Sequence, residues 1–254
     1  MDEVERGDDP EASAIKTRSI TFRRVVDLSH QIHPGIPLWP GDPPVRFTTA
    51  ATLENEGFRL GSFSMGEHSG THINAPISFH AQGMAIHAYP PDSLVAPAVV
   101  LDVQDRVPAD AGHCLDLSDL ANWETKWGPV PAGCIVLLAT GWDSRWNDPR
   151  GYLGYDSEGK MHFPGYGLDA ARVLVEERGV AGLGIDTHGL DSGLVPNGEG
   201  SFAINKLLLE KPRIALENLA NLDQLPAVGC TLVIGILRLK DGAGSPVSVL
   251  AFVP

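Results

Sequence analysis

The chain has 254 residues, of which 43% are hydrophobic and 20% charged, which is typical of one soluble globular α/β domain. Its formal net charge of −13 argues against nucleic acid and anionic membranes as partners, because binding to phosphates requires clustered Lys and Arg. Its three widely spaced cysteines indicate neither a disulfide framework nor a cysteine zinc site, and they are typical of a reducing compartment.

The N-terminal residues 1–22 are acidic and then basic with little hydrophobic periodicity, so we expect a flexible leader before one domain over residues 23–254. No apolar run approaches the roughly 18 residues of a membrane-spanning helix, and the N-terminus lacks the apolar core of a signal peptide. The composition therefore predicts a cytoplasmic protein.

The first predicted strand covers residues 25–29 and leads into a loop, residues 34–44, which is rich in Pro and Gly. Trp39 lies inside this loop. It either caps the hydrophobic core or forms the wall of a pocket for a planar substrate.

The segment His68-Ser-Gly-Thr-His72-Ile-Asn74-Ala-Pro76 is the most informative stretch of the chain. Its glycine, proline and β-branched residues disfavour a helix, so we expect a loop that enters a strand. Alternation along that strand places His72 and Asn74 on one face, and Gly70 allows the backbone to bend so that His68 reaches the same face. The two histidines are either ligands of a metal or hydrogen-bonded loop residues.

The remaining chain alternates apolar runs with helical patterns. Short apolar runs predict buried strands over residues 98–103, 134–139, 180–185, 231–239 and 247–253. Helical spacing predicts helices over residues 117–127, 168–178 and 202–210, and Gly179 is expected to end the second one. This interleaving predicts an α/β fold with a mixed sheet.

Glu217 ends an apolar run that begins at Ile214, where a charge is costly unless it is paired or bound to a cation. It either ligates a metal or forms an ion pair with Arg213 or a nearby lysine, and Asn218 and Asn221 could satisfy it by hydrogen bonds.

The sequence resembles the cyclase family, the kynurenine formamidase-like metal-dependent hydrolases that include isatin hydrolase and trans-dienelactone hydrolase. The resemblance covers roughly residues 25–254. It rests on Trp39-Pro-Gly-Asp42, residues 68–79, Gly184-Ile-Asp-Thr187 with Leu190-Asp191, residues 216–226, and Gly244-Ser-Pro246. It implies a single domain with a mixed central β-sheet or barrel-like core flanked by helices, of the swivelling β/β/α type. It also implies a homodimer or homotetramer.

Three residues depart from the family pattern. Asn74 replaces an aspartate, Ser78 replaces a catalytic histidine, and Asn205 replaces a metal-binding histidine. A neutral amide cannot bridge two cations as a carboxylate does. We therefore expect one divalent cation, zinc or manganese, bound by His68, His72 and Glu217 with Asn74 as a weak ligand.

Proton transfer in this reaction requires a group with a pKa near 7, and the hydroxyl of Ser78 cannot supply one unaided. His80 would lie on the same side of an extended segment as Ser78, and His188 alternates with Asp186 onto one strand face. Each is either an acid and base in the site or a surface histidine. His162 is a weaker candidate.

The expected small-molecule pocket is lined by aromatic residues and one amide: Trp39, Phe63, Phe79, Tyr166 and Asn205. Each aromatic residue could belong to the core instead. The expected reaction is hydrolysis of a cyclic amide, lactone or aryl-formamide bond by a metal-activated water. The alternative is a catalytically silent relative that binds such a molecule without converting it.

Overall fold

The computed structural model describes residues 19–193 and 201–254. Of the leader predicted for residues 1–22, residues 1–18 lie outside the described part of the chain. In the described part of the chain, no helix is both long and apolar enough to span a membrane.

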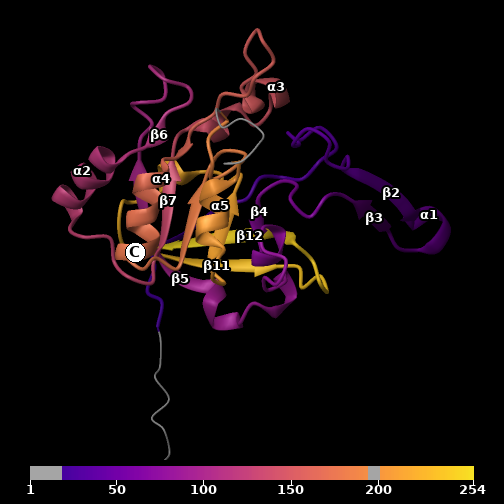
Figure 1. Ribbon diagram of the computed structural model, residues 1–254. Coiled ribbons are helices and arrows are strands. Elements are labelled where there is room, and N and C mark those ends of the chain that lie inside the picture. Colours follow the sequence, from indigo (N-terminus) through magenta and orange to yellow (C-terminus); the bar gives the residue numbers. More distant parts are fainter. Residues whose placement is uncertain (1–18, 194–200) are drawn as a thin grey trace, which may run out of the picture.

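Seven strands form a closed, barrel-like ring. Strands β4, β5, β7, β11 and β12 of this ring are labelled near the centre of Figure 1. Around the ring the order is β12, β11, β5, β7, β9, β10 and β4, and β4 pairs again with β12. The strands of the ring are β4 (His72–Asn74), β5 (Val95–Asp102), β7 (Ile135–Ala139), β9 (Gly182–Ile185), β10 (Ile214–Glu217), β11 (Cys230–Ile236) and β12 (Gly244–Val253). The predicted mixed sheet with a barrel-like core is confirmed.

Strand β1 (Arg24–Asp27) lies outside the ring and pairs antiparallel with β12. Strands β5, β7, β9 and β10 run parallel, and β4, β11 and β12 pair antiparallel with their neighbours. Each predicted strand from residue 98 onwards is present, although β11 ends at Ile236 and β12 begins at Gly244.

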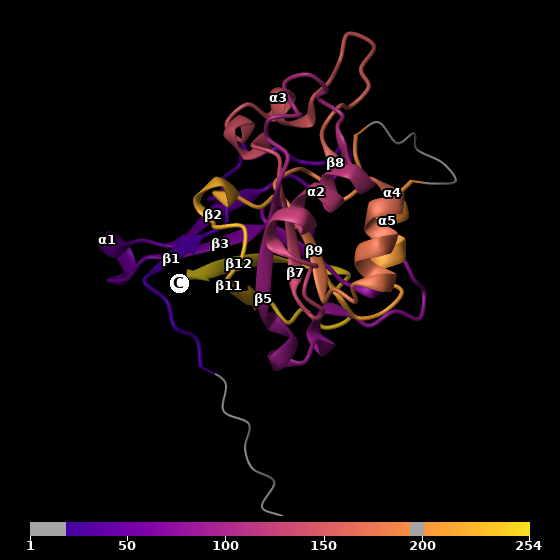
Figure 2. The ribbon, with the colours of Figure 1, turned by 90° about the vertical axis from the view of Figure 1, so that its left-hand side faces the viewer.

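The parallel strands are buried on both faces, which explains their nearly continuous apolar sequences. In β7, for example, Ile135 and Leu137 pack inside the ring, whereas Val136 and Leu138 pack in a second cluster under the helices. Helices α2 (Leu117–Trp127), α4 (Leu168–Arg172) and α5 (Ala203–Leu208) supply that cover, as Figure 2 shows for α4 and α5.

The helix predicted over residues 168–178 consists of an α-helical part followed by a π-helical part. After α4 the chain forms a π-helical turn, Val173–Glu177, with the amide of Arg178 bonded to the carbonyl of Val173. Gly179 follows with φ 64°, a left-handed conformation that ends helices readily. The helix predicted over residues 202–210 is shorter, as α5, and the helix over residues 117–127 matches α2.

Several elements lie away from the ring. They are α1 (Leu53–Glu56), α3 (Pro149–Leu153) and the two-stranded sheets formed by β2 (Arg46–Ala51) with β3 (Leu60–Ser64) and by β6 (Cys114–Leu115) with β8 (Gly165–Tyr166). We call residues 46–64 the arm. It projects from the barrel in Figure 1, and all five residues of β3 are exposed.

Candidate active site

The centre of the site is built by neighbouring strands of the ring. Strand β4 pairs antiparallel with β10 so that His72 lies opposite Glu217 and Asn74 lies opposite Ala215. Opposed residues in an antiparallel pair point to the same face, and so do residues two apart on one strand. His72, Asn74 and Glu217 therefore share one face, although Glu217 follows His72 by 145 positions.

The imidazole of His72 and the carboxylate of Glu217 form a buried pair. Nε2 of His72 lies 3.1 Å from Oε2 of Glu217, and the two residues are 2% and 5% exposed. Burial alone would raise the pKa of Glu217, but the bonds from His72 and Asn205 outweigh it and the net pKa is lowered. Arg213 instead donates to the carbonyl of Leu208, so the predicted ion pair with Glu217 is absent.

A chain of amides connects Glu217 to His68. Nδ2 of Asn205 donates to Oε1 of Glu217 at 3.0 Å, and Nδ2 of Asn74 donates to Oδ1 of Asn205 at 3.1 Å. Oδ1 of Asn74 lies 2.7 Å from Nδ1 of His68. Because a carboxylate only accepts, each amide must turn its NH₂ group towards Glu217, and Nδ1 of His68 must carry the proton. We call these four residues the amide relay.

Gly70 and Gly244 position His68. Gly70 has φ 68°, the bend that the sequence predicted, which brings His68 back towards the strand. A Cβ atom on Gly244 would lie 2.6 Å from Cε1 of His68, so only glycine leaves room for the ring. Burial, followed by the charge of His72, lowers the pKa of His68 and favours its neutral form.

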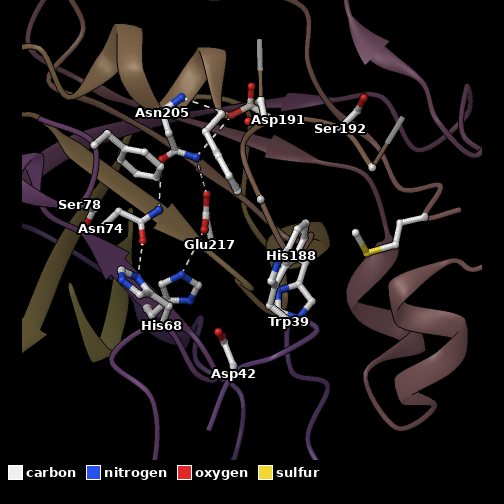
Figure 3. A pocket seen from close by; sticks show the side chains of 17 residues that line it. Trp39, Asp42, His68, Asn74, Ser78, His188, Asp191, Ser192, Asn205 and Glu217 are labelled. Atoms are coloured by element: carbon white, nitrogen blue, oxygen red, sulfur yellow. Dashed lines mark hydrogen bonds and ion pairs between the residues drawn. The ribbon is translucent and has the colours of Figure 1, made fainter. Parts of the chain in front are cut away.

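The side chains open onto a cavity of about 260 Å³, shown in Figure 3. The expected residues that line it are Trp39, His68, His72, Asn74, Ser78, Phe79, His188, Asn205 and Glu217. Trp39 and Phe79 both contact Phe202, with ring centroids 6.3 Å and 5.6 Å apart, so aromatic rings form one wall. Trp39 therefore borders the pocket.

Among the three candidate histidines, His80, His162 and His188, only His188 lies in the cavity wall. It is 5% exposed, and its Nε2 has no hydrogen-bond partner in the described part of the chain. The rings of Trp39 and Tyr152 contact it with centroids 5.6 Å and 5.8 Å away. Burial lowers the pKa of His188 to about 4, so its ring is neutral at neutral pH.

The other candidates are engaged elsewhere. Nε2 of His80 contacts the backbone carbonyl of Lys206, and Nε2 of His162 contacts the carboxylate of Asp156 at 2.7 Å. Ser78 lines the cavity, but its hydroxyl donates to the carbonyl of Ala243. His80 and His162 therefore lie outside the cavity wall.

Two of the expected pocket residues are misplaced. Phe63 is 59% exposed on the arm, and the hydroxyl of Tyr166 donates to the core carbonyls of Val136 and Gly184. An aromatic residue in a strand is equally suited to a surface hairpin or to the core. The residue type alone therefore did not predict where Phe63 and Tyr166 lie. The cavity also contains residues to which the sequence assigned no role: Asp42, Met161, Asp191 and Phe202. Asp42 and Asp191 belong to the motifs that carry the family resemblance, and this was the one indication in the sequence that they lie in the site.

The donors around His72 fit part of a metal site. Two ligands on one tetrahedral cation with bonds of about 2.1 Å lie about 3.4 Å apart, close to the 3.1 Å between His72 and Glu217. Nδ1 of His72 bonds the carbonyl of Gly70 at 3.0 Å, which leaves Nε2 to face the carboxylate. Within residues 19–193 and 201–254, however, no three His, Cys, Asp or Glu side chains form a ready cluster. The predicted set of three ligands is therefore not preassembled, and Nδ1 of His68 bonds Oδ1 of Asn74.

The chain is similar to several named hydrolases. An isatin hydrolase from Roseibium aggregatum is 32% identical over 244 residues, which cover 91% of this chain and 92% of that protein. A kynurenine formamidase from Salinibacter ruber is 40% identical over 225 residues, 88% of this chain and 94% of that protein. The structure of isatin hydrolase A from Ralstonia solanacearum superposes with a TM-score of 0.85 at 32% identity, covering 91% of this chain and 92% of that one.

The family model described as putative cyclase matches residues 26–192, which include the histidine segment and the motif around Asp186. Glu217 and Asn205 lie beyond the matched region. Glu217 joins it in space through the pairing of β4 with β10, and Asn205 joins it through its hydrogen bond with Asn74. On sequence and on fold, the chain belongs to the putative cyclase family.

Proposed function

We propose that this protein is a metal-dependent hydrolase that opens a cyclic amide, lactone or aryl-formamide bond. The observation that carries the proposal is the buried pair of His72 and Glu217 at the base of an aromatic-walled cavity. Relatives over most of the chain are an isatin hydrolase and kynurenine formamidases, which favours hydrolysis over the alternative of a silent binding protein.

One divalent cation, zinc or manganese, would be held by His72 and Glu217, with His68 and Asn74 beside them. Such a cation lowers the pKa of bound water and polarises a carbonyl group. The neutral amides at positions 74 and 205 add hydrogen bonds but no charge, which favours one cation rather than two.

The substrate would be held by the aromatic wall. Trp39, Phe79 and Phe202 offer flat apolar surfaces suited to a planar ring. The ring of His188 lines the same cavity, and its Nε2 has no hydrogen-bond partner among the described residues, so it would accept a proton from water and return it to the leaving group.

The first experiment combines metal analysis of the purified protein with turnover of isatin, N-formylkynurenine and dienelactones. We expect about one zinc or manganese ion per chain and opening of at least one of these bonds. Bound metal without any turnover would favour the silent alternative. Absence of any bound or recruitable metal would contradict the proposal.

A substitution tests the metal ligands directly. His72→Ala should abolish both cation binding and turnover, while far-ultraviolet circular dichroism stays unchanged, because β4 keeps its backbone pairing. His80→Ala is the matched control, since its ring bonds the carbonyl of Lys206 outside the cavity wall. Retention of a stoichiometric cation in His72→Ala would show that the ligand assignment is wrong.

We also propose that the protein is a cytoplasmic homodimer or homotetramer. All three cysteines are free, as suits a reducing compartment. The exposed apolar residues of the arm supply a surface that a second copy of the chain would cover.

A further inference from the structure

Tyr152 is a buried residue near the site for which the proposed mechanism has no role. It belongs to α3, it is 0% exposed, and its backbone carbonyl accepts a hydrogen bond from the indole of Trp142 at 2.6 Å. Its hydroxyl lies 2.9 Å from Oδ1 of Asn218 and 2.9 Å from the carbonyl of Asp186. Burial, reinforced by nearby carboxylates, raises its pKa well above the usual value, so the hydroxyl keeps its proton.

Asn218 connects this hydroxyl to the histidine segment. Its Nδ2 donates to the carbonyl of Gly70 at 2.9 Å, and that carbonyl also lies 3.0 Å from Nδ1 of His72. Asn218 is 0% exposed, and its backbone has φ 56°, so the side chain is held at the turn that follows β10.

The direction of each bond follows from the carbonyl of Gly70, which can only accept. The group of Asn218 that faces it must be the NH₂, so Oδ1 faces Tyr152 and accepts from its hydroxyl, whose single proton is shared with the carbonyl of Asp186. Nδ1 of His72 must carry a proton for the same reason. Nε2 of His72 is thereby directed towards Glu217 and the cavity.

We propose that Tyr152 is a positioning residue for His72, acting through Asn218 and the carbonyl of Gly70. The inference rests on the proposed function in one respect, that Nε2 of His72 is a metal ligand. Hydrogen-bond partners behind a ligating histidine fix its ring orientation, and their loss typically costs about 10-fold to 100-fold in metal affinity.

The test is Tyr152→Phe, which removes one hydroxyl and keeps the ring. Oδ1 of Asn218 would then be buried without its donor, and the amide would be free to turn away from Gly70. We expect zinc affinity, measured by titration calorimetry, to fall by about 10-fold, the lower end of the range for lost outer partners. In the cation-free protein, the nuclear magnetic resonance signal of the His72 Nδ1 proton should shift and exchange faster with water.

Tyr166→Phe is the matched control. Tyr166 is 2% exposed, and its single hydroxyl proton is likewise shared between two acceptors, the carbonyls of Val136 and Gly184, but within the described residues no hydrogen bond connects it to His72. It should lower the thermal unfolding temperature to a similar extent without moving the Nδ1 signal or the zinc affinity. The signal is assigned by its loss in His72→Gln.

Equal behaviour of the two Tyr→Phe variants in both measurements would overturn the proposal and make Tyr152 a purely structural residue. If Tyr152→Phe does not fold, Asn218→Asp tests the same connection, because it replaces the Nδ2 donor with an oxygen and suits the left-handed backbone. The Nδ1 signal should change in that variant too, and an unchanged signal would reject the connection. If the wild-type protein binds no zinc, the metal assignment fails, whereas the Nδ1 exchange still decides whether Tyr152 positions His72.

Discussion

At the scale of single residues, the amide relay explains how this site accommodates Asn74 and Asn205. A carboxylate and an imidazole at these positions would add a charge and a ring nitrogen beside Glu217, and both are suited to a second cation. The two amides instead satisfy each other and Glu217 by hydrogen bonds, and both are nearly fully buried. The two amides therefore satisfy Glu217 without adding charge, which favours one cation rather than two.

The double substitution Asn74→Asp with Asn205→His should create a second cation site. The metal content measured by plasma mass spectrometry should rise from about one to about two ions per chain, because a carboxylate can bridge two cations. Asn122→Asp, which adds the same charge on the exposed surface of α2, should leave the content unchanged. A content that stays at one in the double variant would show that the relay does not set the number of cations.

At the scale of elements, the arm is a hairpin whose stability is not accounted for by contacts with the barrel. A two-stranded hairpin is marginally stable in water when neither face is covered, and the arm exposes both faces of β3. Phe47 and Phe63 are directly paired across it, with ring centroids 6.3 Å apart and exposures of 52% and 59%. Both ends of the arm continue into residues of the cavity, Asp42 before it and His68 after it.

Replacing Phe47 and Phe63 together with Thr should dissociate the proposed oligomer. Threonine retains the preference for strands but removes the aromatic surface. Light scattering after size-exclusion chromatography should show a shift to the mass of one chain. Leu117→Thr removes an exposed apolar residue from α2 and should leave the mass unchanged. A wild-type protein that is already monomeric would reject the assembly.

The strands of the barrel could be predicted from the sequence because their apolar runs follow from burial on both faces, as at residues 135–139. The arm could not, since residues exposed on both sides carry no alternation between polar and apolar. The sequence left open whether Tyr166 lines the pocket or belongs to the core, and the structure places it in the core, where two carbonyls accept from its hydroxyl.

In the site, the segment of His68 and His72 gave the strand face and the bend at Gly70 correctly. Its partner Glu217 was suggested by its charge at the end of an apolar run and by the family resemblance. The sequence could not decide whether His80 or His188 lies in the site, because alternation along an extended segment could direct either side chain towards it. The cavity wall includes His188 and not His80.

At the scale of the whole molecule, buried histidines make folding stability depend on pH. His30 stacks on Trp146 with ring centroids 3.9 Å apart, and its Nε2 is buried without a hydrogen-bond partner among the described residues. Burial lowers the pKa of His30 from 6.5 to about 4. The unfolded chain therefore takes up a proton near pH 6.5, whereas the folded protein resists protonation until about pH 4.

The contribution of His30 to the free energy of unfolding should consequently be complete above pH 6.5 and should be lost as the pH falls towards 4. One pKa unit corresponds to about 1.4 kcal/mol, so the contribution of His30 is on the order of 3 kcal/mol. Urea unfolding at pH 7.5 and pH 5 should show a smaller difference for His30→Phe than for the wild type. His33→Gln, at a ring that accepts a bond from Gly35 in its own loop, should keep the full difference.

The closure of the barrel and the assembly of the site use the same short strand. His72 and Asn74 belong to β4, whose pairing with β10 and β12 joins the two ends of the ring. These contacts link residues more than 140 positions apart, which is the kind of contact that slows folding through its loop entropy. Refolding chains that have formed their local hairpins and helices but have not closed the ring would therefore be inactive, and recovery of turnover would report the last step of folding.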